Sequence, residues 1–142
     1  MATRADFRTA LAARRRPTYS DVALSFALNP VTDSLAIVED EECVAQFLRC
    51  LILTMTDEWA FEPGNGSWVR RSLFDPSDQV TLDLISETIS QAVAARAPMV
   101  SLVGVRVVPR FDGTSAEVTL AYRVVGRPAG VSTLTIVLRR IR

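Results

Sequence analysis

The stretch EWAFEPGNGSWVRRSLFDP, residues 58–76, contains both tryptophans of the chain, two phenylalanines, two glycines, two prolines and two adjacent arginines. It joins two segments with helical periodicity, whereas most connections between elements have only about 4–6 residues. Its glycines permit turns that other residues resist, and Pro63 fixes one backbone angle. The composition therefore predicts a long, irregular connector with a defined shape.

Helical patterns flank the connector on both sides. Residues 39–55 begin with acidic side chains, which suit a helix N-terminus. Residues 77–98 begin at Ser77 or Asp78, either of which can cap a helix, and close at Pro98. Apolar side chains at i, i+3 and i+4 predict the buried faces. These faces are Cys43, Val44, Phe47, Leu48, Leu51 and Ile52 in the first helix, and Leu82, Ile85, Ile89 and Val93 in the second.

Strand patterns occupy both ends of the chain. Alternation over 21–28 and the short apolar run 35–38, separated by turn residues, predict a β-hairpin. The C-terminal part predicts three antiparallel strands joined by turns, at 99–109, 116–125 and 131–141. Together these patterns predict an α+β fold, with an N-terminal β-hairpin and two main helices packed on a small three-stranded antiparallel sheet.

The charge is neutral overall but unevenly spread along the 142 residues. Residues 1–18 carry five arginines against one aspartate. We therefore predict a basic arm over residues 1–17 and one domain over residues 18–142. The arm, with Arg14, Arg15 and Arg16, is either a solvated tail or a segment that docks on an acidic protein surface or on nucleic acid. Arginines without interleaved aromatic residues are weak support for nucleic acid.

Several function classes find no support. The chain has no histidine, the usual general base and the commonest metal ligand. Glu58 and Glu62 could act as paired carboxylates on a sugar, but their spacing does not set a catalytic separation. No apolar run approaches the roughly 18 residues of a membrane span, and no signal peptide is visible. Cys43 and Cys50, seven positions apart on one helix, are predicted to be buried thiols.

A structural interpretation suits the connector better. Arginine matches a carboxylate with two hydrogen bonds, so Glu58 is expected to pair with Arg70 or Arg71 and tie the two helices together. The surrounding aromatic and apolar residues are expected to anchor this pair; they are Trp59, Phe61, Trp68, Leu73 and Phe74. The alternative is that both arginines are solvated and the aromatic side chains fill the core.

The order of these motifs resembles the baseplate-wedge family of contractile injection machines. The resemblance covers roughly residues 18–140, and its most specific part is residues 58–76. Glu58, Pro63 and either Arg70 or Arg71 match the family's Glu–Pro–Arg signature. The chain departs from the family pattern at Asp57 and Trp59, where Gly and Arg are common. Trp59 either replaces that arginine by packing or faces a partner.

The resemblance implies a structural role rather than an enzyme, a cofactor or a metal. Such proteins sit in the inner wedge of the baseplate, contact other wedge proteins and template the first ring of sheath subunits, by adding strands to a sheet. Candidate partner contacts are Trp59, Trp68, Arg14, Arg15, Arg16, Arg139 and Arg140. The terminal arginines either guard the last strand against random pairing or mark the edge offered to the sheath.

The resemblance further implies a place in the tail baseplate of a phage virion, assembled in the host bacterial cytoplasm. Neither nucleic acid, a membrane nor a small-molecule substrate is expected as a partner. The first alternative is the same role in a type VI secretion system or an extracellular contractile particle. The others are a peptidoglycan hydrolase and a small adaptor that binds one soluble protein.

Overall fold

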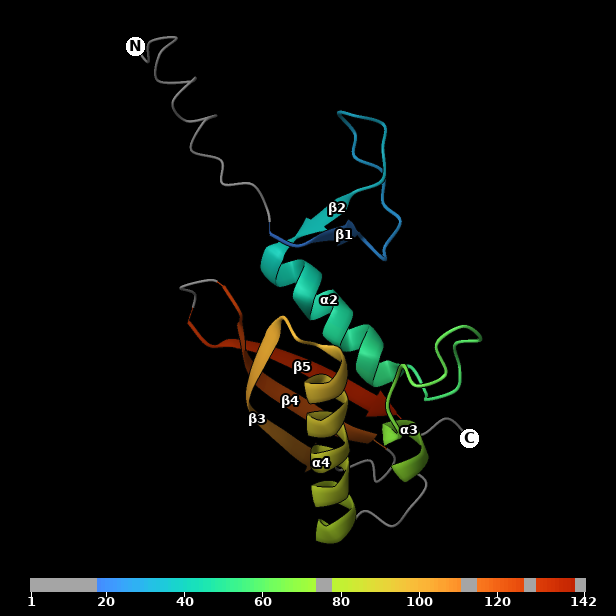
Figure 1. Ribbon diagram of the computed structural model, residues 1–142, viewed down its shortest axis with the longest axis vertical. Coiled ribbons are helices and arrows are strands. Elements are labelled where there is room, and N and C mark those ends of the chain that lie inside the picture. The colour runs from blue at the N-terminus through green and yellow to red at the C-terminus, as the bar shows by residue number, and fades with distance from the viewer. Residues whose placement is uncertain (1–17, 74–77, 111–114, 127–129, 140–142) are drawn as a thin grey trace. The chain divides into compact units, whose positions relative to one another are not determined.

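The computed structural model describes residues 18–73, 78–110, 115–126 and 130–139 (Figure 1). The predicted α+β class is confirmed: a two-stranded antiparallel sheet, a three-stranded antiparallel sheet and helices follow one another along the chain. Contacts divide the chain into two compact units, Met1–Cys43 and Val44–Arg142. The proposed division into an arm over 1–17 and one domain over 18–142 stays a prediction.

The first unit contains a β-hairpin, as predicted, but its strands are short. Strand β1, Ser20–Val22, pairs with β2, Ile37–Glu39, and an isolated bridge between Leu28 and Leu35 extends the ladder. The expected strand over 21–28 ends early because the chain turns after Ala23: the Phe26 amide donates to the Ala23 carbonyl at 3.0 Å, and Phe26 has a φ of 50°.

The helices match their sequence signals closely. Helix α2, Asp40–Leu53, begins with three acidic residues, and helix α4, Gln79–Arg96, begins after Asp78. The Asp78 carboxylate accepts a hydrogen bond from the Thr81 amide at 2.8 Å, which lowers the pKa of Asp78 below its ordinary value. A short helix, α3, Val69–Ser72, is an element that periodicity did not predict.

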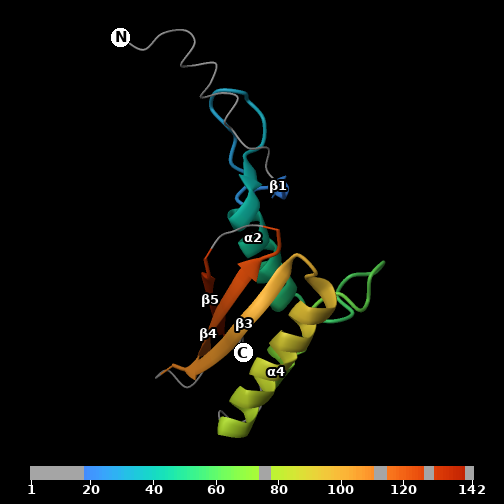
Figure 2. The ribbon, with the colours of Figure 1, turned by 60° about the vertical axis from the view of Figure 1, so that its left-hand side comes forward.

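The three C-terminal strands form the predicted meander, in the order β3–β4–β5. They are β3, Val100–Pro109, β4, Ser115–Val124, and β5, Ser132–Arg139. Helix α4 packs against β3 and covers one face of the sheet (Figure 2). The alternating side chains that the sequence pointed to are buried, namely Val118, Leu120, Tyr122 and Val124 in β4 and Leu134, Ile136 and Leu138 in β5.

The buried helix faces agree with the periodicity except at their margins. Val44, Leu48, Leu51 and Ile52 are buried in α2, as are Ile85, Ile89 and Val93 in α4. Phe47, Leu82 and the two cysteines are only half-buried. Cys43 and Cys50 do not form a disulfide with each other, as predicted from their spacing.

Candidate assembly surfaces

The base of the connector is fixed by buried polar contacts. The Ser67 hydroxyl donates to the Ile52 carbonyl at 2.8 Å, and the Ser67 amide donates to the Thr54 carbonyl at 2.9 Å. Gly66, with a φ of 123°, passes so close to Met55 that a Cβ would stand 2.7 Å from its carbonyl. Residues 54–67 therefore form a closed loop, which we call the connector loop, whose two ends are held together by Ser67 and Gly66.

The middle of the connector loop is shaped by local hydrogen bonds. The Asp57 amide donates to the Pro63 carbonyl at 2.8 Å, and the Glu58 carboxylate accepts from the Met55 amide at 2.8 Å. Asp57 has a φ of 72°, which explains why a glycine would also suit this position. Glu58 and Pro63 thus both act on the loop's own backbone.

The expected ion pair between Glu58 and Arg70 or Arg71 is wrong for this structure. The only salt bridge among the described residues joins Arg110 and Glu117, at 3.1 Å on the surface. The physical reason is local: the turn presents the Met55 amide to the Glu58 carboxylate three residues away, and this short-range bond takes the place of the longer-range one. A structural role for Glu58 remains, by a different contact.

The two arginines have separate surroundings. The Arg71 guanidinium lies over the Trp68 ring, 5.6 Å from its centroid, in a cation–π contact. Arg70 instead lines a pocket of about 320 Å³ together with Arg139 at the end of β5. The remaining lining is apolar: Leu53, Leu73, Val137 and Leu138. The fold therefore brings together two arginines that the sequence analysis had assigned to different motifs, and Arg140 lies outside the described residues.

The aromatic side chains of the connector do not anchor it, contrary to expectation. Phe61 is fully exposed, Trp59 is 52% exposed and Trp68 is 46% exposed. Phe74 lies outside the described residues. The loop base is closed by a serine and a glycine, so the aromatic side chains at the tip are free to face outward. Trp59 and Trp68 were named as possible partner contacts. Phe61 was not among the predicted partner contacts, because an aromatic residue beside a turn is usually buried in the core.

The two edges of the three-stranded sheet differ. Each outer strand pairs on one side only within the described part of the chain. The register of β3 with β4 shifts between Leu102 and Gly104, whereas β5 pairs with β4 without interruption from Ser132 to Arg139. A bulge twists an edge and disturbs its ladder, so β5 offers the more regular template for another strand.

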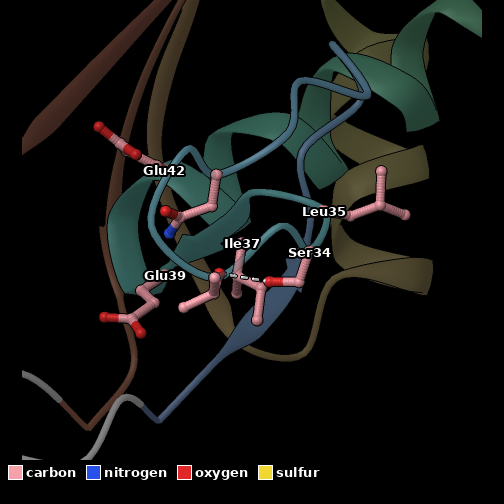
Figure 3. A pocket seen from close by; sticks show the side chains of 7 residues that line it. Ser34, Leu35, Ile37, Glu39 and Glu42 are labelled. Carbon is pink, nitrogen blue, oxygen red and sulfur yellow. Dashed lines mark hydrogen bonds between the residues drawn. The ribbon is translucent and has the colours of Figure 1, made fainter.

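The β1–β2 hairpin exposes both apolar and acidic side chains. Seven large apolar residues between positions 22 and 37 are exposed: Val22, Leu24, Phe26, Leu28, Val31, Leu35 and Ile37. A pocket of about 470 Å³ in the same unit is lined by the apolar side chains of Leu35 and Ile37, by Asn29, and by four further polar or acidic side chains (Figure 3). We call it the hairpin pocket; the four side chains are Thr32, Ser34, Glu39 and Glu42.

Two negative findings hold for the described part of the chain. No group of three or more histidine, cysteine, aspartate or glutamate side chains could hold a metal ion. No described helix has both the length and the apolar character that crossing a membrane would need.

Comparison with known proteins gives a fold but no sequence family. No protein-family model matches the chain, and no curated protein matches its sequence. Among solved structures, a Geobacter sulfurreducens protein named provisionally as a tail lysozyme shares the fold with a TM-score of 0.67. It is 23% identical, and the match covers 75% of this chain and 98% of that one.

A chain in the baseplate of the anti-feeding prophage matches with a TM-score of 0.59 and 17% identity, over 87% of both chains. A chain in the baseplate of pyocin R2 after contraction matches with a TM-score of 0.49 and 17% identity, over 80% of this chain and 96% of that one. At the level of the fold, the resemblance noted in the sequence is confirmed by the first two structures.

Proposed function

We propose that this chain is a structural component of the baseplate of a contractile tail, where it acts as an inner wedge protein and sheath initiator. The observation that carries the proposal is that β5, an outer strand of the sheet, pairs with β4 without a register shift, on a domain whose fold is shared with a baseplate chain of the anti-feeding prophage. A strand from the first sheath subunit would add to this edge, with backbone hydrogen bonds providing affinity and side-chain pockets providing register.

The pocket lined by Arg70 and Arg139 would fix the register of such a strand. Arg70 and Arg139 line it together with apolar side chains and without an acidic one among the described residues. An incoming strand that carries an acidic residue next to an apolar one would fit there, because guanidinium groups pair with carboxylates in a fixed geometry. Arg139 then marks the edge offered to the sheath rather than guarding it.

The connector loop would face another wedge protein. Its base is closed by buried contacts at Ser67 and Gly66, while Trp59 and Phe61 stand exposed at its tip. Exposed aromatic side chains on a fixed support are typical of interface anchors, because little conformational freedom is lost on binding. The loop thus presents its two aromatic side chains in a set position.

Electron cryo-microscopy of particles from cells that express this chain tests the proposal directly. We expect density for this fold beneath the first sheath ring, with a sheath strand paired to β5. A junction that lacks the chain would refute the function and leave the fold likeness standing. Capsid genes beside the gene would indicate a phage, and their absence a type VI or extracellular particle.

Substitutions at the connector test the same proposal by genetics. Glu58→Ala, or Arg70→Ala together with Arg71→Ala, is expected to block the formation of sheath-bearing tails. Glu62→Ala is the matched control, because Glu62 is exposed in the same loop and no described residue bonds to its side chain. Glu58→Gln keeps an oxygen acceptor for the Met55 amide, and is expected to assemble normally. Normal tails from Glu58→Ala would contradict the role of the connector.

The proposed role is structural rather than catalytic. The chain has no histidine, and the Glu58 carboxylate is engaged by the Met55 amide. A muralytic assay on the purified protein, prompted by the provisional name of the Geobacter protein, is expected to show no activity above the buffer. Degradation of peptidoglycan that is lost in the Glu58→Gln/Glu62→Gln variant would instead establish a hydrolase.

A further inference from the structure

The first unit has a pronounced separation of charge along the sequence. Residues 18–43 contain six acidic residues and not one basic residue. Residues 1–17 contain five arginines and one aspartate. Acidic and basic stretches that follow each other so closely attract one another over the short distance that salt leaves unscreened, roughly 8 Å at physiological ionic strength.

The acidic stretch has a shaped surface rather than a plain charged face. Glu39 and Glu42 line the hairpin pocket, and their side chains extend to the same side of it (Figure 3). The apolar side chains of Leu35 and Ile37, both exposed, also line the pocket. No ion pair within the described residues involves either glutamate. The pocket therefore suits a segment that carries arginines and apolar side chains together.

Residues 1–17 of the chain are such a segment, and the residue that follows them, Thr18, is bonded close to the hairpin pocket. The Thr18 amide donates to the Asp40 carboxylate at 2.8 Å, and Ser20 lies opposite Glu39 in the ladder. Arg14, Arg15 and Arg16 precede Thr18 by only two to four residues, which is about 7–14 Å of extended chain. Arginines this near to Thr18 are within reach of Glu39 and Glu42.

We infer that the hairpin pocket is the docking site of the chain's own residues 1–17, with Arg14–Arg16 paired to Glu39 and Glu42 and apolar arm residues over Leu35 and Ile37. Apolar side chains suited to this contact precede the arginines: Phe7, Leu11 and Ala12. This gives the arginine cluster a partner inside the chain, in place of the neighbouring protein that the sequence alone suggested. The inference does not depend on the proposed function.

The acidic side chains of the first unit also act on a neighbouring thiol. Burial, together with the negative charges of Asp21 and Asp40, raises the pKa of the Cys43 thiol. Asp21 on β1 and Asp40 at the start of α2 thus place negative charge near Cys43, in the same unit as the hairpin pocket.

Trypsin cleavage of the 142-residue chain tests the inference, because the enzyme cuts after arginine and its targets in the arm include Arg14 and Arg15, beside the proposed contact. The variant Glu39→Gln/Glu42→Gln removes both carboxylates without changing side-chain size. We expect it to raise the rate of cleavage at Arg14 and Arg15 by roughly fivefold, since exposed ion pairs are individually weak and cleavage follows the open population. Mass spectrometry of timed samples gives the rates.

The matched control is Glu62→Gln/Glu87→Gln, which removes two exposed carboxylates from the second unit and is expected to leave the rates unchanged. Circular dichroism and the cleavage rate at Arg110 establish that each variant is folded. We also expect 0.5 M salt to speed cleavage of the parent chain and not of the hairpin variant, because added salt screens the ion pairs.

The concentration of the chain separates the possible occupants. Protection of Arg14 and Arg15 that is the same at low and high concentration supports docking within one chain. Protection that rises with concentration would assign the pocket to the arm of a second copy and overturn the inference. Equal cleavage rates in the parent and in the Glu39→Gln/Glu42→Gln variant would also overturn it.

Discussion

The three-stranded sheet and the connector loop use apolar side chains in opposite ways. In β4, alternate residues such as Leu120 are completely buried, and regular backbone pairing fixes their direction. In the connector loop the backbone is closed by Ser67 and Gly66, and the large side chains at the tip point outward. The sheet is held by buried apolar side chains, whereas the loop is held by hydrogen bonds to its backbone and by the close approach of Gly66 to Met55.

The largest effect on stability is expected where a side chain holds the structure. Leu120→Ala removes a fully buried side chain from the central strand, and is expected to lower the free energy of unfolding by about 2–5 kcal/mol. Urea denaturation followed by circular dichroism measures it. A loss below about 1 kcal/mol would mean that the sheet does not depend on this core, and the comparison would fail on that side.

A substitution at Gly66 tests the other half of the comparison. Gly66→Ala places a Cβ within 2.8 Å of the Thr54 and Met55 carbonyl oxygens at a φ of 123°, so we expect a loss of about 3 kcal/mol. Gly126→Ala is the control, because Gly126 also has a positive φ, of 84°, but meets nothing within 4 Å. It is expected to cost about 1 kcal/mol. Equal losses would show that close packing at Gly66 does not hold the loop.

The same contrast explains how far sequence reasoning could go. Regular periodicity predicts the sheet and both long helices, because one repeated interaction decides the direction of each side chain. Asp78 is recognisable as a helix cap from its position alone. These features depend on residues near one another in the sequence.

In the connector loop, sequence patterns did not predict the contacts and exposure of specific residues. Glu58, expected to pair with Arg70 or Arg71, bonds to the Met55 amide, and periodicity carries no information about that choice. Phe61 was expected to anchor the connector, because aromatic residues are usually buried, yet it is fully exposed. For Trp59 the sequence left packing and a partner contact open, and it is half exposed. The β1 strand is short because the chain turns at Ala23–Phe26, and the alternation of apolar residues over 21–28 does not predict that turn.

A smaller effect is expected from the hydrogen bond at the loop base. Ser67→Ala leaves a carbonyl of Ile52 without the 2.8 Å contact to a buried hydroxyl, at an expected cost of about 1–2 kcal/mol. Ser101→Ala, at an exposed position on β3, is expected to change stability by less than about 0.5 kcal/mol. If the two variants unfold at the same urea concentration, the Ser67 hydroxyl is not what holds the loop base.

The cap of α4 gives a pH dependence. The hydrogen bond from Thr81 lowers the folded pKa of Asp78, so its carboxylate favours the folded state above the unfolded pKa of about 3.9. This stabilisation is lost as pH falls through the lower, folded pKa. We expect the melting temperatures of the parent and of Asp78→Asn to differ at pH 6 and to converge toward pH 2. A difference that stays constant over this range would contradict the charged cap.

The smallest effect on stability is expected at Phe61, the largest side chain at the tip of the connector loop. Because Phe61 is fully exposed, Phe61→Ala should change the free energy of unfolding by less than about 0.5 kcal/mol. If the tip faces a wedge protein, the same variant should assemble few sheath-bearing tails, since an aromatic anchor is lost. Val80→Ala removes another exposed apolar side chain, in the first turn of α4, and should assemble normally. A Phe61→Ala chain that unfolds several kcal/mol more easily would place Phe61 in a core, and the loop would then be held by its side chains as the sheet is.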